Sequence, residues 1–221
     1  MGTSTFRAVI FDLDGVITDT AHYHFLAWKR LSEGLGMPYD EAFNERLKGV
    51  DRMASLELIL ARSDRSYTPE EKVALAARKN EHYQQLIATM TPADLLPGAL
   101  DALNSVRQAG LKLGLASVSK NAFTVLDRLG ITDCFDYVVD ANQIVRGKPD
   151  PEIFLNAAAH LRVPPPACIG VEDAVAGIRA IKAAGMYAVG IGNPAILTEA
   201  DRVMPGLSDF HLADYAPASR A

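Results

Sequence analysis

The chain has 221 residues, enough for one or two domains with a large hydrophobic core, so it needs no disulfide to fold. Hydrophobic residues make up 49% and charged residues 22%, which excludes a disordered or fibrous chain. With 22 Lys and Arg against 27 Asp and Glu, the net charge of −5 argues against binding to nucleic-acid phosphates. It does not exclude a small phosphate ligand, for which a few local cations suffice.

The two cysteines, Cys134 and Cys168, have neither the number nor the spacing of a disulfide framework or a zinc site, which favours a reducing compartment. No stretch approaches the roughly 20 apolar residues of a membrane helix, and the first residues do not follow a signal-peptide pattern. We therefore expect a soluble, cytoplasmic protein that binds neither a membrane nor nucleic acid. We also expect a monomer, although no sequence feature fixes the oligomeric state.

Strands and helices alternate along most of the chain. Runs rich in β-branched and aromatic residues predict buried strands, and the periodic apolar stretches between them predict helices. From about residue 97 onward this alternation predicts an α/β fold, a Rossmann-like parallel-sheet core with helices on both faces. An additional edge strand is expected near Phe210–Leu212. The other expected strands are 7–11, 111–116, 137–139, 168–171 and 187–191, and the expected core helices are 98–108, 121–129, 151–161 and 174–184.

Only helical patterns fill the segment between the first strand and residue 97. Apolar residues recur at helical spacing over Ala21–Leu35, and Thr68–Glu71 is a capping box with proline at the first helical position. This segment has the size of a small domain, so we interpret it as a helical cap domain inserted after the first strand. The expected boundaries are 1–17 and 93–221 for the core and 18–92 for the cap, with hinges near Thr18 and residues 91–94.

Acidic and polar residues follow several of the predicted strands. The sequence Asp-Leu-Asp-Gly at 12–15 follows the first strand, and Ser117 follows the second. Lys148 lies in a later loop, and Glu172 and Asp173 end the fourth strand. Ligands of an open α/β sheet bind beyond the carboxyl ends of its strands, so these side chains should meet at one edge. Carboxylates this close repel one another unless a cation lies among them, and their hard oxygen atoms suit Mg²⁺.

Each of these features also has an ordinary structural explanation. An Asp-Gly string is a common turn, Glu172 and Asp173 can cap a helix, and Lys148 can be a solvated loop residue. Their joint placement favours a functional site, because unrelated residues would scatter over both edges of the sheet. Motifs for a calcium loop, a P-loop, a penicillin-binding S-x-x-K site and a dinucleotide site each lack a required feature.

Four short motifs, in chain order, resemble those of the haloacid dehalogenase-like phosphotransferase superfamily. The inserted helices resemble the cap of that superfamily. Residues of the insertion extend the resemblance to its β-phosphoglucomutase branch, which implies interconversion of β-D-glucose 1-phosphate and D-glucose 6-phosphate. The core motifs are 11–16, Ser117, Lys148–Pro149 and Glu172–Asp173, and the insertion contributes 18–20, His24, Trp28, 43–45, 47–50 and Arg52.

The resemblance implies how the phosphoryl group would be transferred. Asp12 would be the nucleophile that forms an aspartyl-phosphate, and Asp14 would be the general acid and base. Ser117 and Lys148 would hold the phosphoryl group that moves. A mutase must also hold a second, distal phosphate and keep water out, which closure of the cap would achieve.

The resemblance also implies a cofactor, an intermediate and further site residues. One Mg²⁺ per chain would be the cofactor, and β-glucose 1,6-bisphosphate would be the intermediate and activator. Small sugar phosphates would be the only partners. The implied metal ligands are Asp12, Asp14 through its main-chain carbonyl, Glu172 and Asp173; Thr20 and His24 would couple Asp14 to the cap; and Arg52, Lys48, Gly49, Ser55, Lys79, Ser119 and Asn121 would bind substrate.

Two other functions stay open at this point. A Mg²⁺-dependent sugar-phosphate phosphatase would share Asp12, Asp14 and the metal but would release phosphate to water. A non-catalytic regulator would bind a sugar phosphate in the same pocket but would not catalyse its conversion. Arg52 separates the first alternative from a mutase, because a phosphatase for monophosphates does not need a distal phosphate site.

Overall fold

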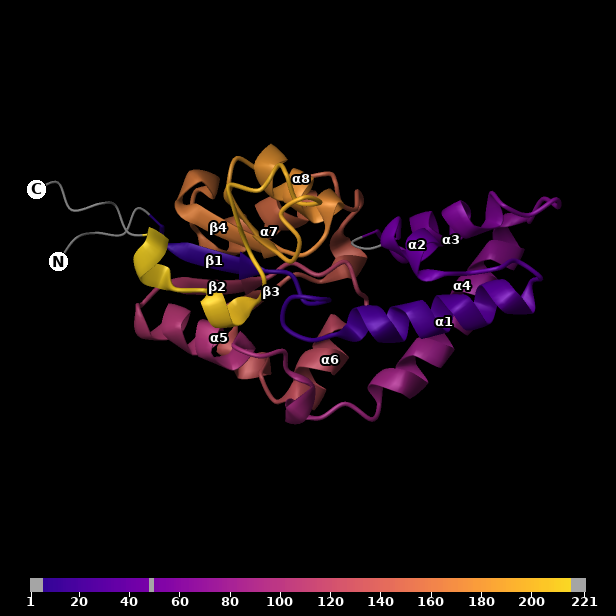
Figure 1. Ribbon diagram of the computed structural model, residues 1–221, viewed down its shortest axis with the longest axis horizontal. Coiled ribbons are helices and arrows are strands. Elements are labelled where there is room, and N and C mark those ends of the chain that lie inside the picture. Colours follow the sequence, from indigo (N-terminus) through magenta and orange to yellow (C-terminus); the bar gives the residue numbers. More distant parts are fainter. Residues whose placement is uncertain (1–5, 48–49, 216–221) are drawn as a thin grey trace, which may run out of the picture.

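The computed structural model describes residues 6–47 and 50–215 (Figure 1). Six strands form one sheet in the order β3-β2-β1-β4-β5-β6, and every neighbouring pair is parallel. The strand order reverses between β1 and β4, which is where an open sheet of this kind binds its ligands. The strands are β1 (Ala8–Phe11), β2 (Lys112–Leu115), β3 (Tyr137–Val138), β4 (Cys168–Glu172), β5 (Tyr187–Ile191) and β6 (Arg202–Met204).

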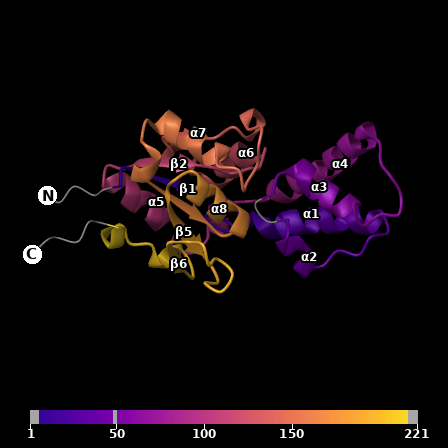
Figure 2. The ribbon, with the colours of Figure 1, turned by 90° about the horizontal axis from the view of Figure 1, so that it is seen from above.

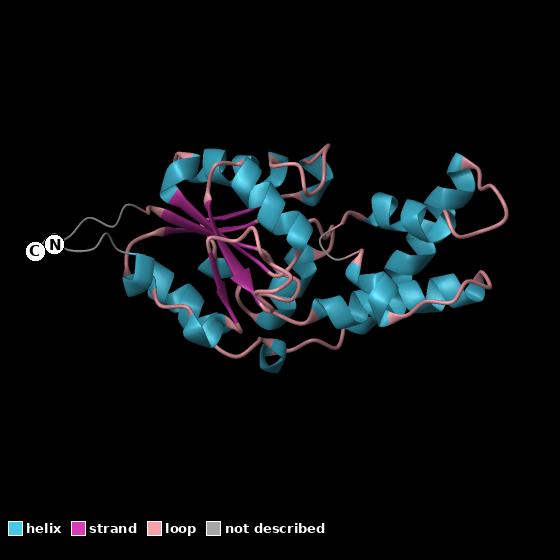
Figure 3. Ribbon diagram, turned by 45° about the horizontal axis from the view of Figure 1, so that its top comes forward, coloured by secondary structure: helices cyan, strands magenta, loops and turns pink. Residues whose placement is uncertain are grey.

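Helices cover both faces of this sheet, as predicted (Figure 3). Successive side chains of a strand point to opposite faces. In β1, Val9 and Phe11 pack with α5 and α6, whereas Ala8 and Ile10 pack with α7 and α8. Strands buried on both faces read as continuous apolar runs, which is why the sequence pattern located them. The core helices are α5 (Ala99–Gln108), α6 (Ala122–Leu129), α7 (Glu152–Leu161) and α8 (Val175–Ala183).

Four helices between β1 and residue 88 form a separate group at the other end of the molecule (Figures 1 and 2). They have their own apolar cluster, in which Trp28 and Leu31 pack with Leu56 and Ile59. The predicted capping box is present, because Thr68 accepts from the N–H of Glu71 and its own N–H donates to the Glu71 carboxylate. The helices are α1 (Thr20–Gly34), α2 (Glu41–Glu45), α3 (Arg52–Leu60) and α4 (Pro69–Ile87).

The two chain segments that join this helical group to the sheet are bonded to each other. The Thr18 hydroxyl donates to the carbonyl of Asp94 at 2.7 Å, and the N–H of Leu96 donates to the carbonyl of Ile17 at 2.9 Å. Both crossings therefore lie next to each other, directly after the Asp-Leu-Asp-Gly turn. A rotation of the helical group about these crossings would therefore move its side chains relative to Asp14, which lies in that turn.

The predicted edge strand at Phe210–Leu212 is wrong, and the sixth strand is β6 instead. Phe210 packs its ring edge-to-face on Phe11 with centroids 5.8 Å apart, so it fills the core beneath the sheet. The three residues of β6, between Asp201 and Pro205, are too few to show the alternation of apolar and polar residues that marks a strand.

None of the helices in the described ranges has the length and apolarity needed to cross a membrane. The 3₁₀ turns are Pro92–Asp94, Thr132–Cys134, Ala141–Gln143, Pro165–Ala167, Leu207–Asp209 and Leu212–Tyr215.

Candidate active site

A buried ion-pair cluster lies at the carboxyl ends of β1 and β4. Asp12 follows β1 directly, and Glu172 is the last residue of β4. Lys148, from the loop before α7, donates to Asp12 Oδ1 at 2.7 Å and to Glu172 Oε1 at 2.8 Å. The Lys148 side chain is fully buried. Residues 136 and 24 positions apart in sequence thus meet at the point where the strand order reverses.

Burial and neighbouring charges shift the pKa values of this cluster. Burial raises the pKa of Asp12 to about 8, with Glu172 and Asp14 adding to the effect, although Lys148 opposes it. Burial would lower the pKa of Lys148, but the carboxylates of Asp12 and Glu172 hold it above its usual range. Among the described residues, a single ammonium group faces the carboxylates of Asp12, Glu172 and Asp173, so a further cation would stabilise their ionised forms.

The oxygen atoms here fit a hard divalent cation. Asp12, Glu172 and Asp173 each offer one carboxylate oxygen, and these atoms lie within 4.8 Å of one another. Within the described part of the chain, no N–H donates to the carbonyl oxygen of Asp14, so it is available as a ligand. Glu172 also caps the chain leading into α8, because its Oε2 accepts from the N–H groups of Asp173 and Ala174 at 2.6 and 2.8 Å. A carboxylate has about four lone-pair positions, so these bonds leave room for a metal.

Two glycines bring the backbone close to these carboxylates. Gly15 has φ +79°, and a Cβ there would overlap the Asp173 carboxylate. A Cβ on Gly177 in α8 would overlap the Glu172 carboxylate. The lack of a side chain at both positions therefore lets the acidic groups pack against backbone.

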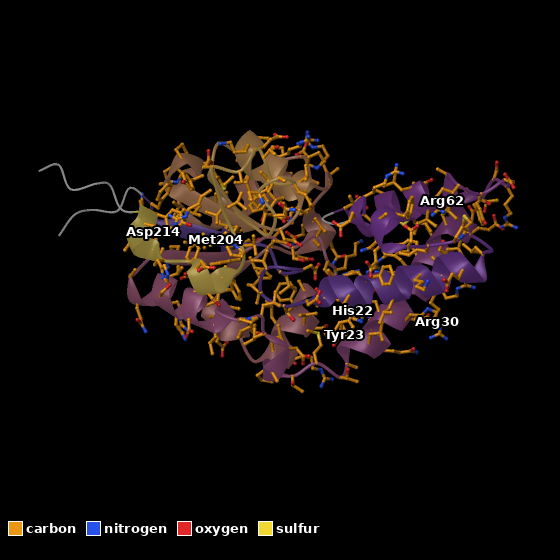
Figure 4. The ribbon with its side chains drawn as sticks, viewed as in Figure 1. His22, Tyr23, Arg30, Arg62, Met204 and Asp214 are labelled. Carbon is orange, nitrogen blue, oxygen red and sulfur yellow. The ribbon has the colours of Figure 1, made fainter. Side chains whose placement is uncertain are left out.

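A cavity of about 440 Å³ separates the sheet edge from the helical group. Asp14 and Asp173 line its floor, while Asp12, Ser117, Lys148 and Glu172 lie buried behind them. His22, on α1, is exposed and lies away from this cavity (Figure 4). Lys48 and Gly49, which the resemblance assigns to substrate binding, fall outside the described residues. The other expected residues on the cavity wall are His24, Arg52, Ser55, Lys79 and Ser119.

Asp14 faces a chain of polar groups from the helical part. His24 Nε2 lies 3.7 Å from Asp14 Oδ2, and Lys79 Nζ lies 2.6 Å from His24 Nδ1. Burial and the charges of Lys79 and Arg52 hold the pKa of His24 well below its usual value, so the ring is neutral. Because Nδ1 faces an amine donor, the ring proton belongs on Nε2, toward Asp14.

The side chains of Thr20 and Ser55 lie near the cavity without contacting the ion-pair cluster. The Thr20 hydroxyl faces the hydroxyl of Tyr83, and it makes no hydrogen bond within 3.5 Å to any described residue. Asp14 Oδ1 is likewise buried without a hydrogen-bond partner among the described residues, which leaves it available to a ligand. Ser55 donates to the carbonyl of Val50 at 3.4 Å and stays at the cavity wall.

Lys79 lies in a box of aromatic rings. Its Nζ lies 4.7 Å from the ring centre of Trp28 and 4.8 Å from that of Tyr83, and the residue is 2% exposed. Burial, aided by Arg52, lowers the pKa of Lys79 to about 7. The amine is therefore partly neutral under physiological conditions.

This buried amine predicts a pH-dependent stability. Between pH 7 and the lysine pKa of about 10.5 in an unfolded chain, the unfolded state binds more protons, so stability rises with pH in this window and is flat below it. The free energy of unfolding of the wild type, relative to that of Lys79→Met, should therefore grow by up to about 1.4 kcal/mol per pH unit from pH 7 to 9. Urea unfolding of both proteins at pH 7, 8 and 9 measures the difference, and equal slopes would contradict it.

A second polar group lies across the cavity from the ion-pair cluster. Asn121 precedes α6 in the loop after β2, and its N–H donates to Ser119 Oγ at 3.3 Å. Asn80 Oδ1, from α4, accepts from Arg52 Nη2 at 2.8 Å and from Asn121 Nδ2 at 2.9 Å. Ser117 Oγ accepts from the N–H of Ser119 at 3.1 Å, which ties this loop to the floor of the site.

Three residues near this group escaped the sequence analysis. Asn80 and Gln84 are polar amides on α4, and Lys120 is an exposed residue that lines the cavity. The sequence could have indicated them through their neighbours, which were already candidate site residues. Asn80 follows Lys79, Gln84 lies one helical turn further, and Lys120 lies between Ser119 and Asn121.

Comparison with known proteins agrees with this architecture. The chain is 52% identical over 208 residues to β-phosphoglucomutase of Bacillus subtilis, which covers 93% of this chain and 92% of that one. A crystal structure of β-phosphoglucomutase from Clostridium difficile matches with a TM-score of 0.92 and 47% identity, over 95% of both chains. A phosphorylated carbohydrates phosphatase of Thermotoga maritima is 33% identical, over 81% of this chain and 82% of that one. The family model for haloacid dehalogenase-like hydrolases matches residues 6–185, and the chain belongs to this family.

Proposed function

We propose that this protein is a β-phosphoglucomutase, interconverting β-D-glucose 1-phosphate and D-glucose 6-phosphate. The observation that carries the proposal is a single cavity with a polar group at each end: the Asp12 cluster at the sheet and the Arg52 group opposite. A sugar bisphosphate has two phosphates to place, and this cavity offers two places. The 52% identity to the Bacillus subtilis enzyme supports the same function.

Asp12 is the nucleophile in this proposal. Its carboxylate attacks phosphorus and forms an aspartyl-phosphate as the bond to the sugar oxygen breaks. Lys148 Nζ lies 2.7 Å from Asp12 Oδ1 and offsets negative charge on the incoming group, while the Ser117 hydroxyl hydrogen-bonds it. Asp12, the Asp14 carbonyl, Glu172 and Asp173 would hold one Mg²⁺ per chain, which would supply further charge neutralisation.

Asp14 is the general acid and base. It protonates the sugar oxygen that leaves phosphorus, and it removes the proton of the hydroxyl that attacks the aspartyl-phosphate. Burial raises the pKa of Asp14 to about 6, close enough to neutral pH for both tasks. His24, Lys79 and Thr20, all from the helical part, position this carboxyl.

The helical part acts as a cap. We assign residues 18–92 to the cap domain and 1–17 with 93–221 to the core, joined at the bonded crossings near Thr18 and Asp94. β-Glucose 1,6-bisphosphate is the intermediate and activator: it turns around in the closed cavity, with Arg52, Ser119 and Asn121 holding the distal phosphate. Ser55 binds substrate at the cavity wall, and Lys48 and Gly49, outside the described residues, are assigned to substrate binding as well. The enzyme acts on small sugar phosphates as a cytoplasmic monomer.

An anomer-resolved assay tests the proposal. With a trace of β-glucose 1,6-bisphosphate and Mg²⁺, the protein should convert β-glucose 1-phosphate, but not the α anomer, to glucose 6-phosphate. Coupled detection of glucose 6-phosphate and of free phosphate separates the alternatives. Free phosphate as the main product indicates the sugar-phosphate phosphatase, which the Thermotoga maritima relative makes the second candidate. Binding without turnover indicates a regulator.

Arg52→Ala sharpens the distinction between mutase and phosphatase. Hydrogen bonds to charged groups are worth about 1.5–3 kcal/mol, so kcat/KM for the mutase reaction should fall roughly 10- to 150-fold. Arg62→Ala is the matched control, because Arg62 stacks on Phe43 at 4.3 Å and lies outside the cavity (Figure 4). A wild-type rate in the Arg52 variant would argue for the phosphatase.

A further inference from the structure

Asn80 joins three elements at one oxygen atom. Its Oδ1 accepts from Arg52 Nη2 at 2.8 Å and from Asn121 Nδ2 at 2.9 Å. Arg52 begins α3 and Asn80 belongs to α4, both in the helical group, whereas Asn121 directly precedes α6 of the sheet domain. The two donors are the groups assigned above to the distal phosphate. A single acceptor therefore sets the separation of a guanidinium from the helical group and an amide from the loop after β2.

Gln84 fixes the remaining freedom of Asn121. Gln84 Nε2 donates to Asn121 Oδ1 at 3.1 Å, so the amide of Asn121 cannot rotate by half a turn without losing both of its bonds to α4. Asn80 and Gln84 are four residues apart and share one face of the helix. Together they direct the Nδ2 group of Asn121 toward Arg52.

The contacts leave donors free for an anion. Arg52 has five N–H groups and Asn121 Nδ2 has two, of which Asn80 takes one from each. Because Asn80 is neutral, this contact holds the guanidinium without cancelling its charge. Arg52 is also partly desolvated, which lowers its pKa and favours an anionic partner over water.

We propose that Asn80 is a positioning residue that pre-aligns Arg52 and Asn121 to bind the distal phosphate of the substrate, with Gln84 fixing the Asn121 amide. The inference rests on the proposed mutase function. Asn80 need not touch the sugar phosphate itself. Its contribution is that two side chains are ordered before substrate arrives, so binding does not have to order them.

Two substitutions at Asn80 separate this role from a merely structural one. Asn80→Ala frees both side chains, and KM for β-glucose 1-phosphate should rise roughly tenfold, the effect of ordering one or two long side chains. Asn80→Asp keeps the acceptor but pairs a carboxylate with Arg52, so KM should rise further, beyond that of the Ala variant. If Asn80 only held the fold together, the Asp variant would bind Arg52 more strongly and would behave like the wild type.

A second measurement separates an effect on the distal phosphate from an effect on the Asp12 cluster. Acetyl phosphate can transfer its phosphoryl group to Asp12, with acetate as the leaving group, and it has no second phosphate. The rate of phosphoenzyme formation from acetyl phosphate should therefore be unchanged in Asn80→Ala and Asn80→Asp. An equal loss with both phosphoryl substrates would overturn the proposal, because the defect would then lie at the ion-pair cluster.

Gln84→Ala should raise KM about threefold, a smaller change because Asn121 keeps its bond to Asn80. Gln85→Ala is the matched control, since Gln85 is an exposed neighbour on the same helix, and the KM of this variant should equal that of the wild type.

The failure of the mutase function and the failure of the positioning role give different results. If the wild-type protein makes no glucose 6-phosphate, the mutase function itself fails. If it does, and KM is the same in all Asn80 variants, only the positioning role fails.

Discussion

Asp12→Asn should abolish turnover and the formation of phosphoenzyme from any phosphoryl donor. Asparagine has the shape of aspartate and still offers Oδ1 to Lys148, but its amide cannot act as an oxygen nucleophile toward phosphorus. The loss is complete because no general acid or base can compensate for a missing covalent acceptor. Intact-mass measurement after incubation with acetyl phosphate should show one added phosphoryl group on the wild type and none on the variant.

The stability of Asp12→Asn provides the control. Burial raises the pKa of Asp12 to about 8, so the folded protein binds a proton there more tightly than the unfolded chain does. The Asp12 contribution to stability is therefore greatest at low pH and falls as the pH rises from about 4 to 8. Without metal at pH 7.5, the variant should stay folded by circular dichroism and unfold at a urea concentration no lower than the wild type does. A variant that still forms phosphoenzyme would show that another residue is the nucleophile.

Much of the core could be predicted because its signals are local. The apolar run of β1, Ala8–Phe11, is buried on both faces, and the capping box at Thr68 sets the start of α4. The meeting of Asp12 with Glu172 followed from a general property of parallel sheets, whose strands all end at one edge. The sixth strand was missed because three residues carry no period.

The polar network opposite the ion-pair cluster could not be predicted from local pattern. Asn80 and Gln84 lie on the polar side of an amphipathic helix, where such residues usually meet water. Their role depends on where α4 stands relative to the loop that holds Asn121, which is a property of the tertiary structure. Lys79 is a similar case. Its side chain is 2% exposed and lies among aromatic rings, but the sequence pattern around it is that of an ordinary surface lysine.

Asp14→Asn should slow the interconversion of the sugar phosphates by about 10²- to 10⁴-fold, the usual effect of removing a positioned acid–base group. The carboxyl lies 3.7 Å from His24 and lines the cavity, so it can reach a sugar oxygen next to the ion-pair cluster. Asp40→Asn is the matched control: Asp40 is an exposed carboxylate that caps α2 and lies outside the cavity, and asparagine caps a helix equally well. Its rate should equal that of the wild type.

The leaving group decides whether the loss comes from proton transfer. A sugar alkoxide is a strong base and needs a proton as it leaves phosphorus, whereas acetate is a weak base and leaves without one. Asp14→Asn should therefore form phosphoenzyme from acetyl phosphate at close to the wild-type rate, yet fail to pass the group to glucose 1-phosphate. Quenched reactions with acetyl phosphate give the rate of phosphoenzyme formation, and addition of glucose 1-phosphate to the phosphoenzyme gives the rate of transfer, both measured by intact mass. If both rates fall by the same factor, the side chain of Asp14 acts on the metal ligands or the loop instead, because a role confined to the proton of the sugar oxygen predicts unequal losses.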